Sequence, residues 1–218
     1  MTSGLFDITI TNIELLRVGL FALIGYLLGS LPTALVISHF KRLNDPRDSG
    51  SGNAGATNMM RLHGKVLALL TLLGDVLKGY LVIWSYQFWE ISQSSDSTHP
   101  SDLQHLWLTL IALSVVIGHI YPIFFQFKGG KGVATILGVM LASSLGMALF
   151  TLFCWISALL ITRVSAYAAL SAAFISPAVA WYIDEPYLGL WLSCSLVLFV
   201  SHRENIQHLI QSKIKTGS

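Results

Sequence analysis

Long apolar runs separated by short polar segments dominate the chain from about residue 18 to residue 201. A helix needs about 20 consecutive apolar residues to cross the hydrocarbon core of a bilayer, and most of these runs reach or approach that length. The pattern therefore predicts an all-α fold, a polytopic membrane helical bundle that forms a single integral membrane domain over residues 1–218. The expected spans are 18–40, 65–89, 105–125, 132–146, 147–162, 164–183 and 187–201.

The uncharged stretch 132–162 could form one helix or two. One helix would be about 46 Å long, well beyond an apolar core about 30 Å thick. Two helices would each be short, with a turn near Ser143, Ser144 and Gly146. Length alone leaves both arrangements open.

The distribution of basic residues decides between them, because lysine and arginine concentrate in the cytoplasmic loops of membrane proteins. Two helices give seven spans, and with the N-terminus outside every basic segment then falls inside. One helix would put Arg163 and the basic tail outside. We therefore expect seven transmembrane helices, N-terminus out and C-terminus in, with the segments 41–64, 124–131 and 202–218 in the cytoplasm. The acidic loops, which then fall outside, are 90–104 and 184–186.

Composition points the same way and makes a soluble globule, a disordered tail or a fibrous protein a poor fit. Hydrophobic residues make up 54% of the 218 residues and charged residues 11%, whereas a soluble domain carries about 25% charged residues. Cys154 and Cys194 lie inside apolar runs, where a cysteine usually serves as a small packing residue. No cluster of Cys, His and carboxylates has the spacing of a zinc site.

Segment 48–61 is rich in glycine, alanine and hydrogen-bond donors. Backbone this free of side chains can turn its N–H groups toward an anion. Arg61, at the end of the segment, adds a planar fork that matches phosphate. A flexible Gly/Ser linker is the alternative, but a linker needs neither the amides nor the arginine. The side-chain donors are Ser49, Ser51, Asn53, Thr57 and Asn58.

A second glycine-rich segment precedes the fourth expected span, where Gly129, Gly130 and Gly132 bracket Lys131. A glycine loop that leads into a helix N-terminus binds anions readily, because free N–H groups and the helix dipole point at the site. The spacing of a nucleotide-binding Walker A loop is absent. The alternative is an ordinary basic loop on the cytoplasmic side, which explains the lysines but not the glycines.

Polar residues inside or next to the spans give weaker signals. Asp75 and Lys78 lie at i, i+3 on one face of the second span, where they can pair. Charges inside a membrane are costly and point to function, although an ion pair that docks the helix is equally consistent. His119, near the end of the third span, is more often structural than catalytic. The polar run 201–208 after the last span resembles a solvated helix end.

Two common catalytic arrangements are absent from the sequence. No histidine is followed five residues later by an aspartate, the pair with which many acyltransferases deprotonate an alcohol. No Gly-x-Ser-x-Gly elbow is present either. Any acyl transfer would therefore run without these bases and nucleophiles.

The polar segments resemble the motifs of the bacterial acyl-phosphate:glycerol-3-phosphate acyltransferases, the integral membrane PlsY family. The first family motif is similar to residues 49–61, the second to 118–135 and the start of the third to 202–206. The turn at 29–32 and the segment 75–79 match as well. The resemblance covers nearly the whole chain, and its first two motifs are long and specific.

The third motif departs from the family pattern after Asn205. His208, Ser212 and Ile214 stand where the family has Arg, Gly and Glu. The role of that glutamate therefore cannot be carried over to this chain, and the effect of the altered tail is left to experiment.

The resemblance implies transfer of a fatty acyl group from acyl phosphate to the 1-hydroxyl of sn-glycerol 3-phosphate. The products would be 1-acylglycerol 3-phosphate (lysophosphatidic acid) and phosphate, in the first step of phospholipid synthesis. It further implies a multi-pass protein of the bacterial inner membrane, in contact with membrane lipid, with its active site on the cytoplasmic side. The resemblance implies no metal, no cofactor and no nucleic acid. It does imply functional coupling to the soluble acyltransferase that forms acyl phosphate.

The chemistry of the residues fits two phosphate sites. Acyl phosphate is an activated mixed anhydride, so positioning and charge stabilisation can supply most of the catalysis. The expected catalytic residues are Ser51, Arg61, Lys131, His202 and Asn205. The residues expected at glycerol 3-phosphate are Arg61, Lys131, Ser165 and Asn205. Those expected at acyl phosphate are Ser51, Gly52, Asn53, Thr57, Asn58, Gly129, Gly130, Lys131 and Gly132. Further candidates are His119, Asp75 and Lys78, and the base is left open between His202, His119 and a substrate phosphate oxygen.

A membrane transporter or channel for a phosphate-bearing anion is the alternative function. Transport sites usually lie near the bilayer midplane, between helices broken in two matching halves. Here the polar motifs crowd one face of the expected bundle and no repeated halves are evident, so the pattern favours the enzyme.

Overall fold

A computed structural model of the chain describes residues 12–92 and 101–216, with the side chains of 101, 102 and 212–216 excepted. Regular structure in this part of the chain is helical throughout, which confirms the all-α expectation. The elements are α1 (Asn12–Gly29), α2 (Thr33–Phe40), α3 (Ala56–His63), α4 (Lys65–Ser92), α5 (Ser101–Ile120), the 3₁₀ turn η1 (Ile123–Phe125), α6 (Val133–Ser143), α7 (Leu145–Thr162), α8 (Ser165–Tyr182), α9 (Leu188–Ser201) and α10 (Arg203–Thr216).

Several of these helices have the length and composition of membrane spans. Within the described ranges, four apolar helical segments are long enough to cross a bilayer, and α6 and α9 are shorter apolar helices. Large hydrophobic side chains remain exposed along the outer faces of α1, α4 and α7. Such an apolar exterior is expected for a bundle surrounded by lipid. The long spans are 12–29, 65–92, 103–125 and 145–162.

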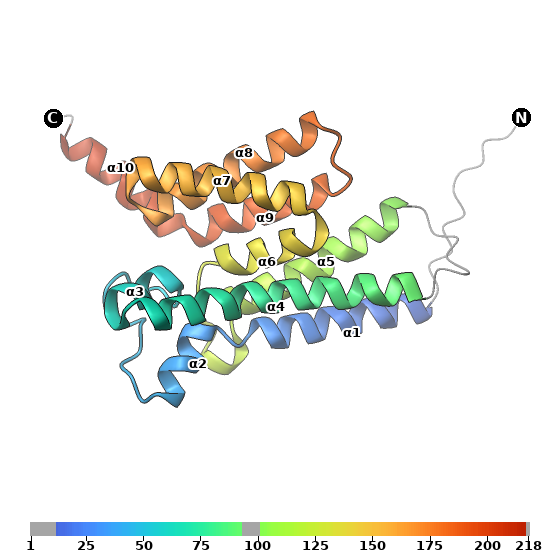
Figure 1. Cartoon of the computed structure of the whole chain (residues 1–218), viewed down its shortest axis with the longest axis horizontal. Coiled ribbons are helices and arrows are strands. Elements are labelled where there is room, and N and C mark those ends of the chain that lie inside the picture. The colour runs from blue at the N-terminus through green and yellow to red at the C-terminus, as the bar shows by residue number, and fades with distance from the viewer. Residues whose placement is uncertain (1–11, 93–100, 217–218) are drawn as a thin grey trace, which may run out of the picture.

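The helices run roughly along one direction in two groups (Figure 1). In the first group α1 packs against α5 and α4 against α6, and in the second α7, α8 and α9 pack in succession. Two glycines let α4 and α6 approach closely, because a Cβ on Gly79 or Gly138 would collide with the backbone of the other helix. Small residues at such contacts are the usual means of packing helices in a membrane.

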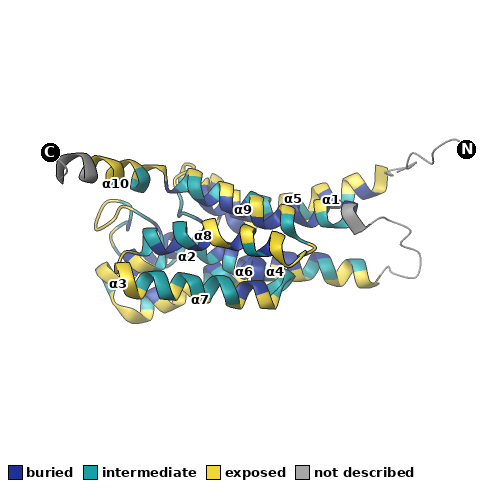
Figure 2. Cartoon of the chain, turned by 90° about the horizontal axis from the view of Figure 1, so that it is seen from above, coloured by how far each residue is buried: buried dark blue, intermediate teal, exposed yellow. Residues whose placement is uncertain are grey.

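The buried residues form one main core along the inner faces of the helices (Figure 2). Trp191 of α9, Tyr86 of α4 and Ile111 of α5 are among its fully buried side chains. A second, smaller cluster ties α2, α3 and the loop between them to the start of α4. Its buried members are Ala34, Leu35, Ala54, Met59 and Ala68. This second cluster holds the first glycine-rich segment against the bundle.

The first expected span is wrong as a single helix over 18–40. The chain leaves α1 at Gly29 and starts α2 only at Thr33, after Pro32 in an extended conformation (φ −61°, ψ 120°). Proline lacks an N–H group and its ring restricts the preceding residue to extended backbone, so Leu31 and Pro32 break the helix. The break reaches the edge of the polar region described below.

Other expected boundaries also differ from the structure. The span 105–125 ends as an α-helix at Ile120, because Pro122 follows. The segments 41–64 and 202–218 were expected as a loop and a tail, but they contain the helices α3 and α10. The acidic loop 90–104 lies partly outside the described residues.

The uncharged stretch 132–162 is two helices and not one. Ser144 separates α6 from α7 in an extended conformation (φ −153°, ψ 101°), two residues before the boundary expected at 146. The helix-breaking signal is thus the serine pair and not Gly146, which lies inside α7.

Candidate active site

The polar segments singled out in the sequence meet at one end of the bundle. The first segment includes α3, the second leads into α6, and the third joins α9 to α10. Figure 1 shows α3, the start of α4 and α10 at the same end, opposite the turn between α8 and α9. Lys131, in the second segment, contacts Asn205 of the third.

Lys131 is held on both sides by the junction of α9 and α10. Its ammonium group contacts Oδ1 of Asn205, and its main-chain oxygen accepts a hydrogen bond of 3.0 Å from Oγ of Ser201. Burial lowers the pKa of the half-buried lysine from its ordinary value, and the nearby carboxylate of Glu204 opposes that effect. A partly desolvated cation of this kind interacts strongly with a phosphate.

His202 lies next to this lysine and is only 2% exposed. Its Nδ1 is 2.9 Å from the main-chain oxygen of Leu198, which can only accept, so Nδ1 carries a proton and Nε2 has a free lone pair in the neutral ring. Burial lowers the pKa of His202, the bond to Leu198 opposes this, and the charge of Lys131 lowers it further. The imidazole is therefore neutral at pH 7 and can accept a proton.

The glycine loop uses part of its backbone to hold itself in place. The N–H groups of Gly129 and Gly130 donate to the main-chain oxygens of Ile120 and His119, at 3.0 and 3.1 Å. These two glycines therefore shape the loop, and their N–H groups do not point at an anion. Gly132 turns the chain with φ +87° into α6.

The N-terminus of α6 supplies backbone donors next to Lys131. Its first helical hydrogen bond runs from Ile136 N to Gly132 O. The N–H groups of residues 132–135 consequently have no partner within the helix, which is the arrangement that binds anions elsewhere.

The buried side chain of Asn58 holds the first segment in place through hydrogen bonds to its backbone. This side chain is 1% exposed. Its Oδ1 accepts from Ser51 N at 2.9 Å, and its Nδ2 donates to the oxygens of Pro46 and Ser49 at 2.7 and 3.1 Å. The amide is fully engaged, so Asn58 positions the loop on which Ser51 is exposed.

The remaining predicted residues of the first segment lie around the same loop. Gly52 is exposed with φ +67°, and Asn53 is half-buried. Thr57 Oγ1 donates to Ser165 Oγ at 3.4 Å, which brings the N-termini of α3 and α8 together. Arg61 is exposed in the last turn of α3, and among the described residues no hydrogen bond joins it to Lys131 or Asn205.

Arg47 links the first and second segments, a role that the sequence analysis missed. Its Nη1 donates to the main-chain oxygens of Phe125 and Lys128, both at 3.0 Å. Its Nε and Nη2 bind the carboxylate of Asp45 at 3.0 and 2.6 Å, which raises the pKa of Arg47 and lowers that of Asp45. The signal available in the sequence is an arginine flanked by Asp45 and Asp48, within the segment 41–64 that is expected in the cytoplasm.

Asp75 and Lys78 pair as their spacing predicts, at 2.8 Å, and His119 joins them with Nδ1 2.8 Å from Lys78 Nζ. Thr33, at the start of α2, donates to the same Asp75 oxygen through its N–H at 3.1 Å and its hydroxyl at 2.9 Å. This buried group lies between the glycine loop and the break after α1.

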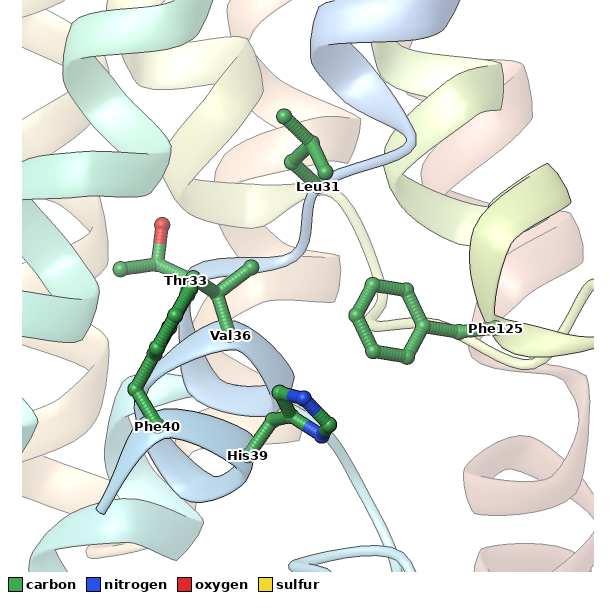
Figure 3. Close-up of a pocket in the computed structure, with 6 residues that line it drawn as sticks. All are labelled: Leu31, Thr33, Val36, His39, Phe40 and Phe125. Carbon is green, nitrogen blue, oxygen red and sulfur yellow. The ribbon is translucent and has the colours of Figure 1, made fainter.

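Two further observations bear on what the site can bind. The described residues contain no group of three or more His, Cys, Asp or Glu side chains that could hold a metal ion. An apolar cavity of about 350 Å³ lies beside α2 and η1 (Figure 3), away from the contact between Lys131 and Asn205. Its lining residues are Leu31, Thr33, Val36, His39, Phe40 and Phe125.

The third motif is altered beyond this point of the chain. His208 is exposed on α10, which extends past the bundle in Figure 2. The side chains of Ser212 and Ile214 lie outside the described residues.

Comparisons with known proteins agree with the resemblance seen in the motifs. The family model for glycerol-3-phosphate acyltransferase matches residues 19–212. A glycerol-3-phosphate acyltransferase of Laribacter hongkongensis is 42% identical over 188 residues, covering 86% of this chain and 90% of the relative. Another, of Methylobacillus flagellatus, is 42% identical over 192 residues, covering 87% and 92%.

A solved structure is similar over most of both chains. The crystal structure of PlsY (YgiH), an integral membrane glycerol 3-phosphate acyltransferase, in its glycerol 3-phosphate form, matches with a TM-score of 0.78 at 34% identity. The match covers 90% of this chain and 93% of that one. An integral membrane fold is thereby supported independently of the apolar pattern.

Proposed function

The chain belongs to the glycerol-3-phosphate acyltransferase family, and from this we propose that it transfers a fatty acyl group from acyl phosphate to the 1-hydroxyl of sn-glycerol 3-phosphate. The products are lysophosphatidic acid and phosphate, and no metal or cofactor takes part. The observation that carries the proposal is the position of Lys131, at the N-terminus of α6 and in contact with Asn205, with neutral His202 beside it.

We assign the acyl phosphate group to the start of α6 and the first loop. The free N–H groups of Gly132 and of the first turn of α6 supply donors, and Lys131 supplies a positive charge. Further donors come from the first loop and the start of α3, namely Ser51, Gly52, Asn53 and Thr57. Gly129, Gly130 and Asn58 support this site by shaping the two loops, since their own amides are engaged.

We assign glycerol 3-phosphate to the other side of the same lysine. Lys131 and Asn205 contact each other, Ser165 contacts Thr57 at the start of α3, and Arg61 supplies a second cation that can turn toward the phosphate from α3. Arg61 is exposed, which fits a site that must admit a substrate from water.

The reaction then proceeds by direct attack. The 1-hydroxyl oxygen of glycerol 3-phosphate bonds to the acyl carbonyl carbon while Nε2 of His202 takes its proton. Lys131 and the N–H groups of α6 stabilise the negative charge that develops on the carbonyl and phosphate oxygens. The bond from the acyl carbon to the phosphate oxygen breaks, and the imidazolium returns its proton to the departing phosphate. His119 and a substrate phosphate oxygen are the other candidates for the base.

Activity measurements on purified protein test this function. Palmitoyl phosphate and palmitoyl-CoA would each be supplied with glycerol 3-phosphate and EDTA, and lysophosphatidic acid and free phosphate would be measured. Product from palmitoyl phosphate alone is expected, and product only from palmitoyl-CoA would contradict the proposed donor. Lys131→Met should abolish product formation, whereas Lys128→Met, an exposed lysine of the same loop, should leave it unchanged.

We further propose seven membrane crossings, with the N-terminus outside and the site facing the cytoplasm of a bacterium, where the soluble enzyme that forms acyl phosphate would supply the donor. The charge distribution along the chain supports this topology. In a protein lacking Cys154 and Cys194, a cysteine at Pro186 should react with a membrane-impermeant maleimide on intact cells. A cysteine at Ser49 should react only after lysis, and the reverse pattern would contradict the orientation.

A further inference from the structure

Four polar side chains form a buried group just below the glycine loop. Thr33 comes from α2, Asp75 and Lys78 from α4, and His119 from the end of α5. Asp75, Lys78 and His119 are only 2%, 9% and 3% exposed. Among the described residues no hydrogen bond joins any of the four to Lys131 or Asn205.

Lys78 is the centre of this group. Its Nζ lies 2.8 Å from Oδ1 of Asp75 and 2.8 Å from Nδ1 of His119. An ammonium group can only donate, so Nδ1 of His119 accepts this bond and the ring proton is on Nε2. The lysine therefore sets both the tautomer and the orientation of the imidazole.

The same ammonium also satisfies the end of α1. Nζ of Lys78 has one N–H left for the main-chain oxygens of Gly29 and Leu31, at 3.2 and 3.3 Å, and these two oxygens share it. The last carbonyls of a helix have no partner within it, and the break before Pro32 leaves these oxygens inside the bundle. Through Asp75, which accepts from Thr33, the group fixes the first residue of α2 as well.

His119 connects this group to the glycine loop. Its main-chain oxygen accepts from Gly130 N at 3.1 Å. A Cβ on Gly130 would collide with Nε2 of the imidazole and would lie 2.9 Å from its Cε1. The ring thus lies directly against the residue that precedes Lys131.

Helix docking alone does not account for such an arrangement. Replacing a buried ion pair by well-packed apolar residues is often neutral or stabilising, so charges retained at this depth call for another role. The contact between the imidazole and Gly130 supplies one, because a rigid support below Gly130 restricts the position of the next residue.

We propose that Lys78 and Asp75 are positioning residues for Lys131, and that they act through His119 and Gly130. The hydrogen bond from Lys78 fixes the orientation of the imidazole, and the imidazole packs against Gly130. This contact fixes the loop so that Lys131 and the start of α6 face the phosphate of the substrate. The effect on catalysis rests on the proposed function, whereas the support of the loop does not.

The test combines kinetics with hydrogen exchange in the full-length protein. Asp75→Asn with Lys78→Met removes both charges together, so that neither is left buried without its partner. His119→Ala removes the support itself. Each variant should lower kcat/KM for glycerol 3-phosphate at least tenfold and speed the exchange of the Gly129 and Gly130 amides at least tenfold.

Combining the variants separates positioning from general destabilisation. The triple variant should lose no more activity than its more damaging component, because both changes act through one contact. Thr71→Val is the control: it removes a buried hydroxyl of α4, one turn before Asp75, that bonds only to its own helix. This variant should lower the melting temperature without affecting hydrogen exchange at the Gly129 and Gly130 amides.

Three outcomes would overturn the proposal: exchange at Gly129 and Gly130 that stays as in the wild type, losses in the triple variant that multiply, or a control that matches the network variants. If the double replacement does not fold, His119→Ala decides by the same two readouts. If the wild type makes no lysophosphatidic acid, the proposed function fails, and the exchange measurement still tests the support of the loop.

Discussion

The hydroxyl of Ser201 donates a 3.0 Å hydrogen bond to the main-chain oxygen of Lys131, 70 residues earlier in the chain. The side chain of the same lysine contacts Asn205. The end of α9 and the glycine loop are thus joined at two points, so the third motif contributes to the site through its first residues. His208, where the sequence begins to depart from the family, is exposed on α10, about one turn after Asn205.

Replacing Asn205 tests whether Lys131 must keep its positive charge available to an anion. Asn205→Ala removes a hydrogen bond to a charged group and should lower kcat/KM about tenfold to a hundredfold, given about 1.5–3 kcal/mol for such a bond. Asn205→Asp keeps the contact but neutralises the lysine, and should therefore lower activity more than alanine does. Steady-state kinetics with both substrates would check this order. Gln207→Glu adds the same charge at an exposed position of α10 and should have little effect.

Arg47→Lys should show that the guanidinium has a geometric role. Arginine bridges Phe125, Lys128 and Asp45 at once, and a lysine cannot reproduce the planar fork. We expect a lower melting temperature and a drop in kcat/KM of about tenfold, as for the loss of one charged hydrogen bond. Arg42→Lys, at an exposed position nearby, is the matched control. Equal effects of the two changes would contradict this role for Arg47.

The lowered pKa of His202 has consequences for stability and for rate. In the unfolded chain this histidine takes up a proton near its ordinary pKa of 6.5, whereas in the folded protein it does so at a lower pH. The unfolded state therefore binds more protons as the pH falls below about 6.5, and stability decreases through that window until the folded pKa is passed. Above about pH 6.5 the contribution of neutral His202 to stability is fully present.

Thermal unfolding from about pH 7.5 to about pH 5.5 would measure this effect, which should be smaller in His202→Gln. If His202 is the base, the acid limb of the wild-type kcat/KM profile lies below its ordinary pKa of 6.5, and the glutamine variant loses that limb together with most of its activity. Retained activity with an unchanged profile would favour a substrate phosphate oxygen as the base. His208→Gln, on exposed α10, serves as the control.

Two glycine substitutions should have opposite outcomes. Gly130→Ala places a Cβ against the imidazole of His119 and 3.1 Å from the oxygen of Ala54, so the loop must shift and activity should fall at least tenfold. Gly146→Ala, in α7, meets nothing within 4 Å and should stabilise the protein by up to about 1 kcal/mol. Thermal unfolding and product formation would be measured for both. An active Gly130→Ala protein would show that the loop tolerates displacement.

The sequence predicted the helical membrane fold, and charge counting correctly divided 132–162 into two helices. These features depend on the composition of whole segments, which a single residue does not change. A turn at 29–32 is visible in the sequence, but the apolar run continues through Leu31 and Pro32, so the run predicts one span over 18–40 where the structure has two helices.

The identity of the site residues was easier to predict than their roles. Asn58 and Gly130 both look like anion donors in the sequence, but the structure engages the Asn58 amide and the Gly130 N–H in the loops themselves. Arg47 went unnoticed because its partners are main-chain oxygens more than 70 residues away. Such contacts depend on the tertiary arrangement and leave no local pattern.

The shortness of α6 determines how the two proposed reactants would meet. Its 11 residues span about 16 Å, roughly half of an apolar core about 30 Å thick, and it begins farther into the bundle than α4 does (Figure 1). Lys131, two residues before α6, would then lie below the surface from which we propose that glycerol 3-phosphate arrives. The acyl donor can stay in the bilayer and reach the site by two-dimensional diffusion. Its effective concentration is then set by its mole fraction among the membrane lipids. Diluting a fixed amount of donor with inert lipid should slow the enzyme even though nothing in the surrounding water has changed.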